Sequence, residues 1–191
     1  MALTTKRPPV EIRPLQLIGA YEILLKPAID ARGYFVRVYD EGTFQAHGLV
    51  SEWKQVNQSL SKRRGTVRGL HFQRPPHAET KLVQAVVGTI FDVIVDLRRS
   101  SSTYGRWVAI ELSDTNHRML YVPKGLAHGY CTLTTAALVQ YKVDSEYAPQ
   151  AEGGVRWDDP ELNIPWPADR AFLSEKDRAL PVLSQLVSPF P

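Results

Sequence analysis

Short runs of apolar and aromatic residues, separated by glycine, proline or small polar clusters, make up most of this chain. The runs that alternate most clearly cover residues 21–26, 34–39, 81–87, 90–97, 107–112, 119–122 and 138–143. Runs of this length, bounded by turn residues, predict β-strands. We expect Gly88-Thr89 to join two of them in a tight hairpin, and residues 113–116 to join another two in the same way. Many short strands with frequent turns predict a sandwich or barrel, not a doubly wound sheet.

The two ends of the chain have a different composition. Residues 1–14 are polar and punctuated by proline, which predicts a loose N-terminal arm. Residues 148–191 are rich in proline and glycine and predict an irregular segment. Acidic residues after Asp40, and the sequence that follows Ser174, predict two short helices. A chain of 191 residues is most simply one domain, 1–191.

Composition and charge exclude several classes of protein. The chain is 43% hydrophobic and 23% charged, as in ordinary globular proteins. Its net charge is +3, and its longest basic run, Lys62-Arg63-Arg64, lies at a predicted turn, which does not indicate a nucleic-acid partner. Cys131 is the single cysteine, so no intrachain disulfide is possible. No apolar run is long enough to span a membrane. We expect a cytoplasmic protein with neither nucleic acid nor membrane as partner.

Ionisable side chains gather around residues 65–73. Arg68 and His71 lie in this stretch, and Lys81 begins the next predicted strand. A histidine can move a proton near neutral pH, and a lysine can stabilise a developing oxyanion, which together suit proton abstraction beside a carbonyl. Strict alternation places Arg68 and His71 on opposite faces of a strand. If both line a pocket, Gly69 must mark a bulge.

Residues 123–128 (Pro-Lys-Gly-Leu-Ala-His) match the P-x-G-x-x-H signature of the cupin family. Cupins commonly bind a metal through an H-x-H pair, a glutamate and this later histidine. Here the pair would be His71 and Gln73, and glutamine is a poor transition-metal ligand. His77 and Glu79 could replace it only from the loop that follows Pro75-Pro76. We therefore expect no metal site.

Motifs spread over residues 30–177 resemble the dTDP-4-dehydrorhamnose 3,5-epimerase family. They are Arg32-Gly33-Tyr34-Phe35, Gln55-Val56-Asn57-Gln58-Ser59, Arg68-Gly69-Leu70-His71, Lys81, Phe91-Asp92-Val93, Asp96-Leu97-Arg98, Ser102-Thr103-Tyr104-Gly105, Pro123 to Gly129, Tyr141-Lys142 and Trp157 to Pro167. The family consists of metal-independent cupins, usually homodimers, that epimerise a 4-keto-6-deoxyhexose carried on a nucleoside diphosphate. The resemblance implies an all-β, cupin-type double-stranded β-helix (jelly roll) with a few short peripheral helices.

The same resemblance implies roles for single residues. His71 matches the family's general base, and Asp177 matches the carboxylate that pairs with it. Lys81 matches the group beside the 4-keto oxygen, and Tyr141 the acid on the opposite face of the sugar. The positions that contact the substrate are matched by Gln55, Asn57, Arg68, His128, Glu152 and Lys176.

Residues 32–37 carry an expectation about assembly. Arg32 and Phe35 match positions that reach the nucleotide of the neighbouring subunit, so the resemblance implies a homodimer. Two residues further on the family usually has a glutamate, and this chain has Arg37. An arginine side chain cannot accept a hydrogen bond from the imide N–H of thymine. Either Arg37 relaxes the preference for thymine, or it turns outward and a neighbour makes that contact.

We expect an isomerase that inverts C3, C5 or both in a nucleoside-diphosphate 4-keto-6-deoxyhexose, without a cofactor. The first expectation is conversion of dTDP-4-dehydro-6-deoxy-D-glucose to dTDP-4-dehydro-L-rhamnose, in deoxysugar or polysaccharide supply. Three alternatives remain at this point. They are an epimerase that inverts one centre of another nucleotide sugar, a metal-dependent cupin enzyme, and a binding module without turnover.

Overall fold

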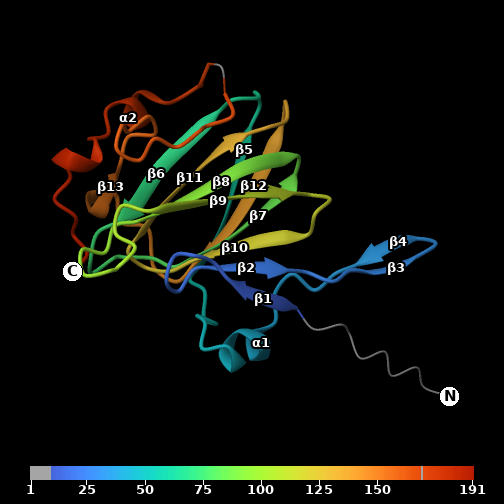
Figure 1. Cartoon of the computed structure of the whole chain (residues 1–191). Helices are drawn as coiled ribbons and strands as arrows, with labels where there is room; N and C mark the ends of the chain where they lie inside the picture. The colour runs from blue at the N-terminus through green and yellow to red at the C-terminus, as the bar shows by residue number, and fades with distance from the viewer. Residues whose placement is uncertain (1–9, 169) are drawn as a thin grey trace.

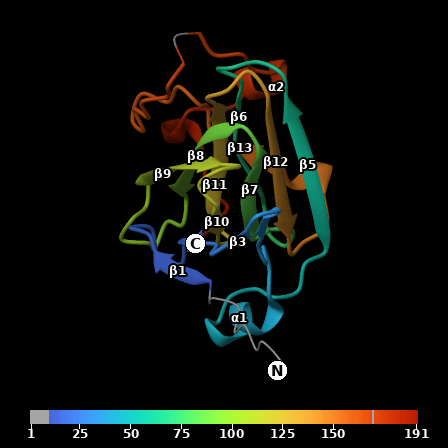
Figure 2. The same cartoon turned by 90° about the vertical axis from the view of Figure 1, so that its right-hand side faces the viewer.

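Two antiparallel β-sheets form most of the molecule in the computed structural model, which describes residues 10–168 and 170–191 (Figures 1 and 2). The order of the six-stranded sheet is β1 (Glu11–Pro14), β2 (Tyr21–Leu24), β10 (Arg118–Val122), β7 (Lys81–Val87), β12 (Ala137–Val143) and β5 (Gln55–Ser61). The order of the five-stranded sheet is β13 (Glu152–Gly154), β6 (Val67–Gln73), β11 (Leu126–Thr132), β8 (Thr89–Asp96) and β9 (Trp107–Ser113). Strands β3 (Ala28–Asp30) and β4 (Gly33–Phe35) pair only with each other.

The helices are short and peripheral. They are α1 (Glu41–Ala46), α2 (Glu175–Arg178) and the 3-10 turns η1 (Pro149–Ala151) and η2 (Leu183–Gln185). Asp40 caps α1 and Ser174 caps α2, each accepting a hydrogen bond from a backbone N–H of the first turn. The sequence predicted both helices and the cap at Ser174. Both views place α1 at the opposite end of the molecule from α2 (Figures 1 and 2). The predicted all-β jelly roll with short peripheral helices is confirmed.

The main hydrophobic core lies between the two sheets and follows from the alternation of side chains along the strands. On β8, Ile90 and Ile94 point into this core, whereas Val93 and Val95 belong to a second cluster on the outer face of the five-stranded sheet. Because both faces of β8 are covered, the strand reads as an almost continuous apolar run. Asp92 interrupts the run and is fully buried on the inner face, and Asp96, also fully buried, ends it.

Each outer face is covered by a different part of the chain. Residues 148–191 supply Val155, Leu162 and Phe190 to the cluster on the five-stranded sheet. On the six-stranded sheet, Phe44 of α1 packs in a third cluster with residues of β2, β7 and β10. The predicted irregular C-terminal segment therefore covers one sheet, and it also contributes strand β13.

Two predicted hairpins were wrong in their pairing, although their strands were right. β7 belongs to the six-stranded sheet and β8 to the five-stranded one, and β9 and β10 are divided in the same way. The turn at Gly88 therefore carries the chain from one sheet to the other. Gly88 has φ +73°, and a Cβ there would lie 2.2 Å from the carbonyl oxygen of Ala136. Alternation predicts where a strand runs but not which strand pairs with it.

Two predicted boundaries near the N-terminus also need correction. The loose arm predicted for residues 1–14 is wrong for Glu11–Pro14, which form β1 and pair with β2. Residues 1–9 lie outside the described part of the chain. The strand predicted for residues 34–39 is shorter, because only Gly33–Phe35 pair, as β4. No helix among the described residues is long and apolar enough to cross a membrane.

The predicted bulge at Gly69 is present. His128 on β11 lies opposite His71 on β6, and Tyr130 lies opposite Arg68, so two residues of β6 face Gly129 alone. Gly69 has φ +116°, a conformation that a residue with a side chain rarely adopts. The extra residue brings Arg68 and His71 to the same side of the strand, and both side chains line the same cavity.

Candidate active site

A cleft opens where the inner faces of the two sheets change from apolar to polar. It consists of two cavities of about 490 and 410 Å³, and both are lined by His71, Lys81, Tyr141 and Lys176. The first cavity adds, among others, Ser59, Arg68, His128, Tyr130, Ser174 and Asp177. The second adds, among others, Gln55, Asn57, Glu79, Tyr147 and Glu152. The four shared residues mark the junction of the two cavities.

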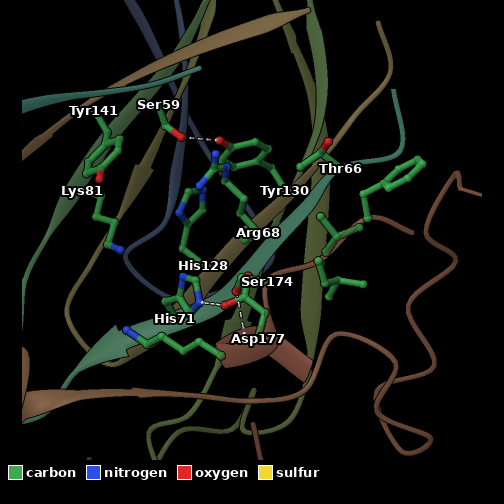
Figure 3. Close-up of a pocket in the computed structure, with 15 residues that line it drawn as sticks. Ser59, Thr66, Arg68, His71, Lys81, His128, Tyr130, Tyr141, Ser174 and Asp177 are labelled. Atoms are coloured by element: carbon green, nitrogen blue, oxygen red, sulfur yellow. Dashed lines mark hydrogen bonds and ion pairs between the residues drawn. The ribbon is translucent and has the colours of Figure 1, made fainter. Parts of the chain in front are cut away.

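His71 and Asp177 form a close pair on one wall of the cleft (Figure 3). Nε2 of His71 lies 2.6 Å from Oδ1 of Asp177, although the two residues are 106 positions apart. β6 places the histidine, and the first turn of α2 places the carboxylate. Asp177 is buried, whereas His71 is partly open to the cleft. One ring nitrogen is therefore fixed and the other remains for a substrate.

The surroundings of Asp177 keep its carboxylate ionised. Burial acts to raise the pKa of Asp177, but the hydrogen bond and charge of His71, the N–H of Gly69 and the hydroxyl of Ser174 outweigh it and lower the pKa below its ordinary value. An ionised carboxylate only accepts hydrogen bonds. In the neutral ring, Nε2 of His71 must therefore carry the proton, and Nδ1 keeps a free lone pair. This is the arrangement of an oriented general base.

Lys81 and Tyr141 come from the six-stranded sheet and face His71 across the cleft (Figure 3). Nζ of Lys81 lies 3.1 Å from Oε1 of Glu79 and 6.0 Å from the centre of the Tyr141 ring. Burial raises the pKa of the Tyr141 phenol, and the negative charge of Glu79 raises it further. At neutral pH the phenol therefore keeps its proton and can donate it. A cation and a proton donor face the base.

Two further predicted residues, His128 and Arg68, line the first cavity. Nε2 of His128 lies 2.7 Å from Oδ1 of Asp92, and both side chains are almost fully buried. Arg68 is more exposed, and its Nε donates to the hydroxyl of Ser61 at 3.2 Å. A paired histidine and a guanidinium here can bind hydroxyl and phosphate oxygens of a substrate.

The second cavity holds the remaining predicted substrate residues. Gln55 and Asn57 lie on β5 with side chains toward it. Glu152 forms an ion pair with Lys176 and accepts a hydrogen bond of 3.0 Å from the Tyr147 hydroxyl. The structure thus gathers ten predicted residues around one cleft, and their elements span β5 to α2.

Residues 32–37 do not reach this cleft in their own chain. Arg32 pairs with Asp30 at 2.7 Å within the β3–β4 hairpin, which projects away from the sheets in Figure 1. Arg37 pairs with Asp40 at 2.7 Å, beside the start of α1. Arg32, Phe35 and Arg37 line neither cavity. A single chain therefore lacks three of the predicted substrate contacts.

Gln73, at the second position of the cupin H-x-H pair, has a set of hydrogen bonds of its own. It is buried, its Nε2 donates to the carbonyl of His77, to Oε2 of Glu79 and to the carbonyl of Glu146, and its Oε1 accepts from the N–H of Ala148. Within residues 10–168 and 170–191, no group of three or more His, Cys, Asp or Glu side chains is placed to hold a metal ion.

Some residues of the cleft were missed from the sequence. Tyr147, Ser174 and Tyr130 line it, and the hydroxyl of Tyr130 donates to Ser59 at 3.1 Å. The sequence indicates Glu79 only as a substitute metal ligand, but in the structure Glu79 pairs with Lys81. No strand period marks Glu79, because it lies in the loop that precedes β7.

Comparisons with known proteins agree on one family. The model of the dTDP-4-dehydrorhamnose 3,5-epimerase family matches residues 14–185. The chain is 45% identical over 161 residues to a dTDP-4-dehydrorhamnose 3,5-epimerase of Methanothermobacter thermautotrophicus, covering 82% of this chain and 86% of that protein.

Solved structures of the same family share the fold. A dTDP-4-dehydrorhamnose 3,5-epimerase of Bacillus anthracis, with TDP and PPi bound, has a TM-score of 0.90 at 44% identity and covers 92% of this chain and 100% of its own. A dTDP-6-deoxy-D-glucose-3,5-epimerase of Legionella pneumophila, in complex with dTDP-4-keto-L-rhamnose, has a TM-score of 0.90 at 34% identity, covering 95% and 97%.

Proposed function

The chain belongs to the dTDP-4-dehydrorhamnose 3,5-epimerase family, and on that premise we propose that it inverts both C3 and C5 of a dTDP-linked 4-keto-6-deoxyhexose. The observation that carries the proposal is the His71–Asp177 pair, 2.6 Å apart, opposite Lys81 and Tyr141 in one cleft. Relatives with this activity, and a relative that binds dTDP-4-keto-L-rhamnose, support the choice of substrate.

Proton removal is assigned to His71. A C–H bond beside a ketone is acidic only when the enolate that forms is stabilised. Nδ1 of His71 accepts the proton, while Asp177 holds the ring in the required tautomer and stabilises the imidazolium. The ketone at C4 activates C3 and C5 alike, so one base can act at both carbons in turn.

Inversion also needs a cation at the carbonyl oxygen and a proton donor on the other face of the sugar. Lys81 supplies the positive charge where the C4 oxygen becomes an oxyanion. Tyr141 donates a proton to the face opposite His71, because its raised pKa keeps the phenol protonated. Arg68 and Lys176 bind the diphosphate as cations, and Gln55 and Asn57 bind through hydrogen bonds.

The proposal is tested by solvent-deuterium incorporation into a panel of nucleoside-diphosphate 4-keto-6-deoxy sugars in D₂O, followed by NMR at C3 and C5. We expect deuterium at both carbons of the dTDP sugar and formation of the L-rhamno product. Deuterium at one carbon only identifies an epimerase of a single centre. A protein that binds the sugar without any exchange contradicts the proposed activity.

The functional unit in this proposal is a homodimer whose β3–β4 hairpin completes the partner's cleft. All residues of both strands are exposed in one chain, including Ile29, Tyr34 and Phe35. The outer face of the six-stranded sheet also exposes Val56 and Leu60 on β5. An isolated two-stranded hairpin is marginal in water, and exposed apolar patches of this kind indicate an interface.

Subunit complementation tests this arrangement. Arg32→Ala and His71→Ala are each expected to lower activity strongly when pure. When equal amounts are unfolded and refolded together, half of the dimers are mixed, and one of the two sites in each has both residues intact. We expect recovery of about a quarter of wild-type activity. Mixtures no more active than the pure variants, or a fully active monomer in sedimentation, contradict the shared site.

The expected compartment remains the cytoplasm. Cys131 is the only cysteine of the chain, and burial raises the pKa of its thiol to about 11, which makes it an inert core residue. The protein therefore needs no oxidising environment to fold.

A further inference from the structure

Glu79 occupies a position in the cleft to which the proposed reaction gives no role. It follows the loop after β6 and lies two residues before Lys81, the first residue of β7. Only 13% of the Glu79 side chain and 12% of the Lys81 side chain are exposed. Both groups line the second cavity. A carboxylate and an ammonium group so well buried are stable only when each has a partner of opposite charge.

The carboxylate of Glu79 makes a separate contact through each oxygen. Oε1 lies 3.1 Å from Nζ of Lys81, and Oε2 accepts a hydrogen bond of 3.2 Å from Nε2 of Gln73. The two contacts fix the orientation of the carboxylate, and the carboxylate in turn fixes the end of a flexible lysine side chain. A lysine has four rotatable carbons, so its charge needs such an anchor to stay at one point.

Gln73 connects this anchor to the loop that forms the second cavity. Its amide is buried and also contacts the carbonyl of Glu146 at 3.1 Å and the N–H of Ala148 at 2.7 Å. Tyr147, between those two residues, lines the second cavity. The position of Glu79 is therefore set by buried hydrogen bonds that depend on neither substrate nor solvent.

We infer that Glu79 is a positioning residue, which holds the ammonium group of Lys81 in place for the C4 oxygen of the substrate. The inference rests on the proposed function, because it assumes that Lys81 stabilises the enolate. An ammonium group already fixed in the free protein stabilises the developing charge without reorganisation during the reaction. Glu79 itself needs no contact with the reacting atoms.

A double-mutant cycle with Glu79→Gln and Lys81→Ala separates this role from a merely structural one. The readout is the rate of solvent-deuterium incorporation at saturating substrate, which reports proton removal and not the later step at Tyr141. Loss of one donor to an oxyanion typically lowers the rate 10²- to 10³-fold, so we expect Lys81→Ala to fall in that range. We expect Glu79→Gln to fall by about 10- to 100-fold, with KM changed less than about threefold.

The effect of Glu79→Gln in the Lys81→Ala background distinguishes a positioning role from a structural one. In the Lys81→Ala background, we expect Glu79→Gln to lower the rate by less than about twofold, because its target is gone. Glu79→Asp keeps the charge at a shorter reach and should retain a rate between wild type and Glu79→Gln. Glu161→Gln, which removes an exposed carboxylate outside the cleft, is the matched control and should leave the rate unchanged.

The pH dependence gives an independent readout. The negative charge of Glu79 raises the pKa of the Tyr141 phenol, so its neutralisation should move the alkaline limb of the epimerisation rate to lower pH. Equal losses from Glu79→Gln in both backgrounds, or no loss in wild type, overturn the inference and leave the proposed function intact. If Lys81→Ala itself retains the wild-type rate, both the inference and the assigned role of Lys81 are overturned.

Discussion

The carboxylate of Asp177 decides which form of His71 faces the cleft. Because the pKa of Asp177 is held below its ordinary value, the carboxylate is ionised at neutral pH and accepts a hydrogen bond from the N–H at Nε2 of His71. An asparagine at this position has the same shape, but its amide can present a donor to the ring. His71 can then turn to the wrong tautomer, with Nδ1 protonated and unable to accept a proton.

We predict that Asp177→Asn lowers the rate of solvent-deuterium exchange by about 10²- to 10⁴-fold, with little change in KM. The measurement is the initial exchange rate at saturating substrate, compared with the thermal stability of the same variant. An exchange rate within about threefold of wild type in a folded variant would show that the pair does not set the tautomer.

Asp96 is the residue whose ionisation contributes most clearly to stability. It is fully buried, and although burial opposes ionisation, hydrogen bonds from Arg98, Thr103 and Ser101 lower the pKa of Asp96 to about 2. A shift of this size from the usual 3.8 corresponds to about 2 kcal/mol of folding free energy. Since the pKa is lowered on folding, this contribution is complete above about pH 4 and is lost as the pH falls through about 2.

Asp96→Asn is therefore expected to lower the free energy of unfolding by about 2 kcal/mol at pH 7. The difference from wild type should shrink as the pH falls from 5 to 2, in urea titrations at each pH. Asp158→Asn, which removes a half-exposed carboxylate paired with Arg156, is the control and should change stability by less than about 0.5 kcal/mol. A difference between Asp96→Asn and wild type that does not depend on pH would contradict this account.

At the scale of single elements, the bulge in β6 places His71, the proposed general base. In a regular strand Arg68 and His71 would point to opposite sides. The bulge adds one residue to β6 between them, and Gly69 is the residue that allows it. A Cβ on Gly69 would lie 2.6 Å from Cα of Gly129 and 2.7 Å from the carbonyl oxygen of His128. These neighbours are backbone atoms of the paired strand, so they cannot move without displacing His128.

Gly69→Ala is predicted to lower the free energy of unfolding by more than about 2 kcal/mol and to reduce the exchange rate of the folded fraction of the variant. Gly42→Ala on α1 is the matched control, since a Cβ there meets its nearest neighbour at an ordinary 3.7 Å. It should be neutral or slightly stabilising, because alanine favours a helix over glycine by about 1 kcal/mol. Guanidinium unfolding measures the stability of both variants. Equal stability of Gly69→Ala and Gly42→Ala would show that the fold does not require the bulge.

The β3–β4 hairpin and the segment after it carry the one departure from the family pattern. Arg37 is already paired with Asp40, and Asp40 also caps α1 by accepting from the N–H of Thr43. To contact a base, Arg37 would have to leave this pair. The ion pair with Asp40 therefore indicates that the Arg37 side chain turns outward and takes no direct part in the choice of base.

We accordingly predict that Arg37→Glu leaves the order of affinities for dTDP, UDP, CDP and GDP unchanged, with no ratio shifted by more than about threefold. Competition binding to wild type and variant measures these ratios. Arg32→Ala is the comparison variant and should weaken all four ligands. A gain of tenfold or more in the preference for dTDP would show that Arg37 does read the base, since one unpaired donor is worth about that much.

The helices and strands also show which features of the fold the sequence alone could predict. Alternation located seven of the strands, and the acidic first turn after Asp40 and the cap at Ser174 located two short helices, because these signals are local. Alternation could not predict which strands pair. The turns at Gly88 and after β9 carry the chain from one sheet to the other, and no local pattern in the sequence distinguishes them from hairpin turns. Asp177 reads as an ordinary acid in a first helical turn, and only the family resemblance placed it beside His71. Glu79 lies in the loop before β7 and has no periodic signal, and its contact with buried Gln73 depends on the folded loop.

At the scale of the whole molecule, the cleft exists because two sheets meet with different inner surfaces. The five-stranded sheet brings His71 and His128, and the six-stranded sheet brings Lys81 and Tyr141. The proposed base and the proposed acid of the inversion therefore come from different sheets. The same architecture leaves the β3–β4 hairpin outside, where a partner subunit can use it.

The measurement that tests this account most directly is deuterium incorporation at C3 and C5 in wild type, His71→Ala and Tyr141→Phe, alongside formation of the inverted sugar. We predict exchange at both carbons in wild type and none at either carbon in His71→Ala, because both protons leave to the same base. Tyr141→Phe should lose epimerisation far more than exchange, since the proton can still return to its original face. Near-normal exchange in His71→Ala would contradict the assignment of the base and, with it, the mechanism proposed for this cleft.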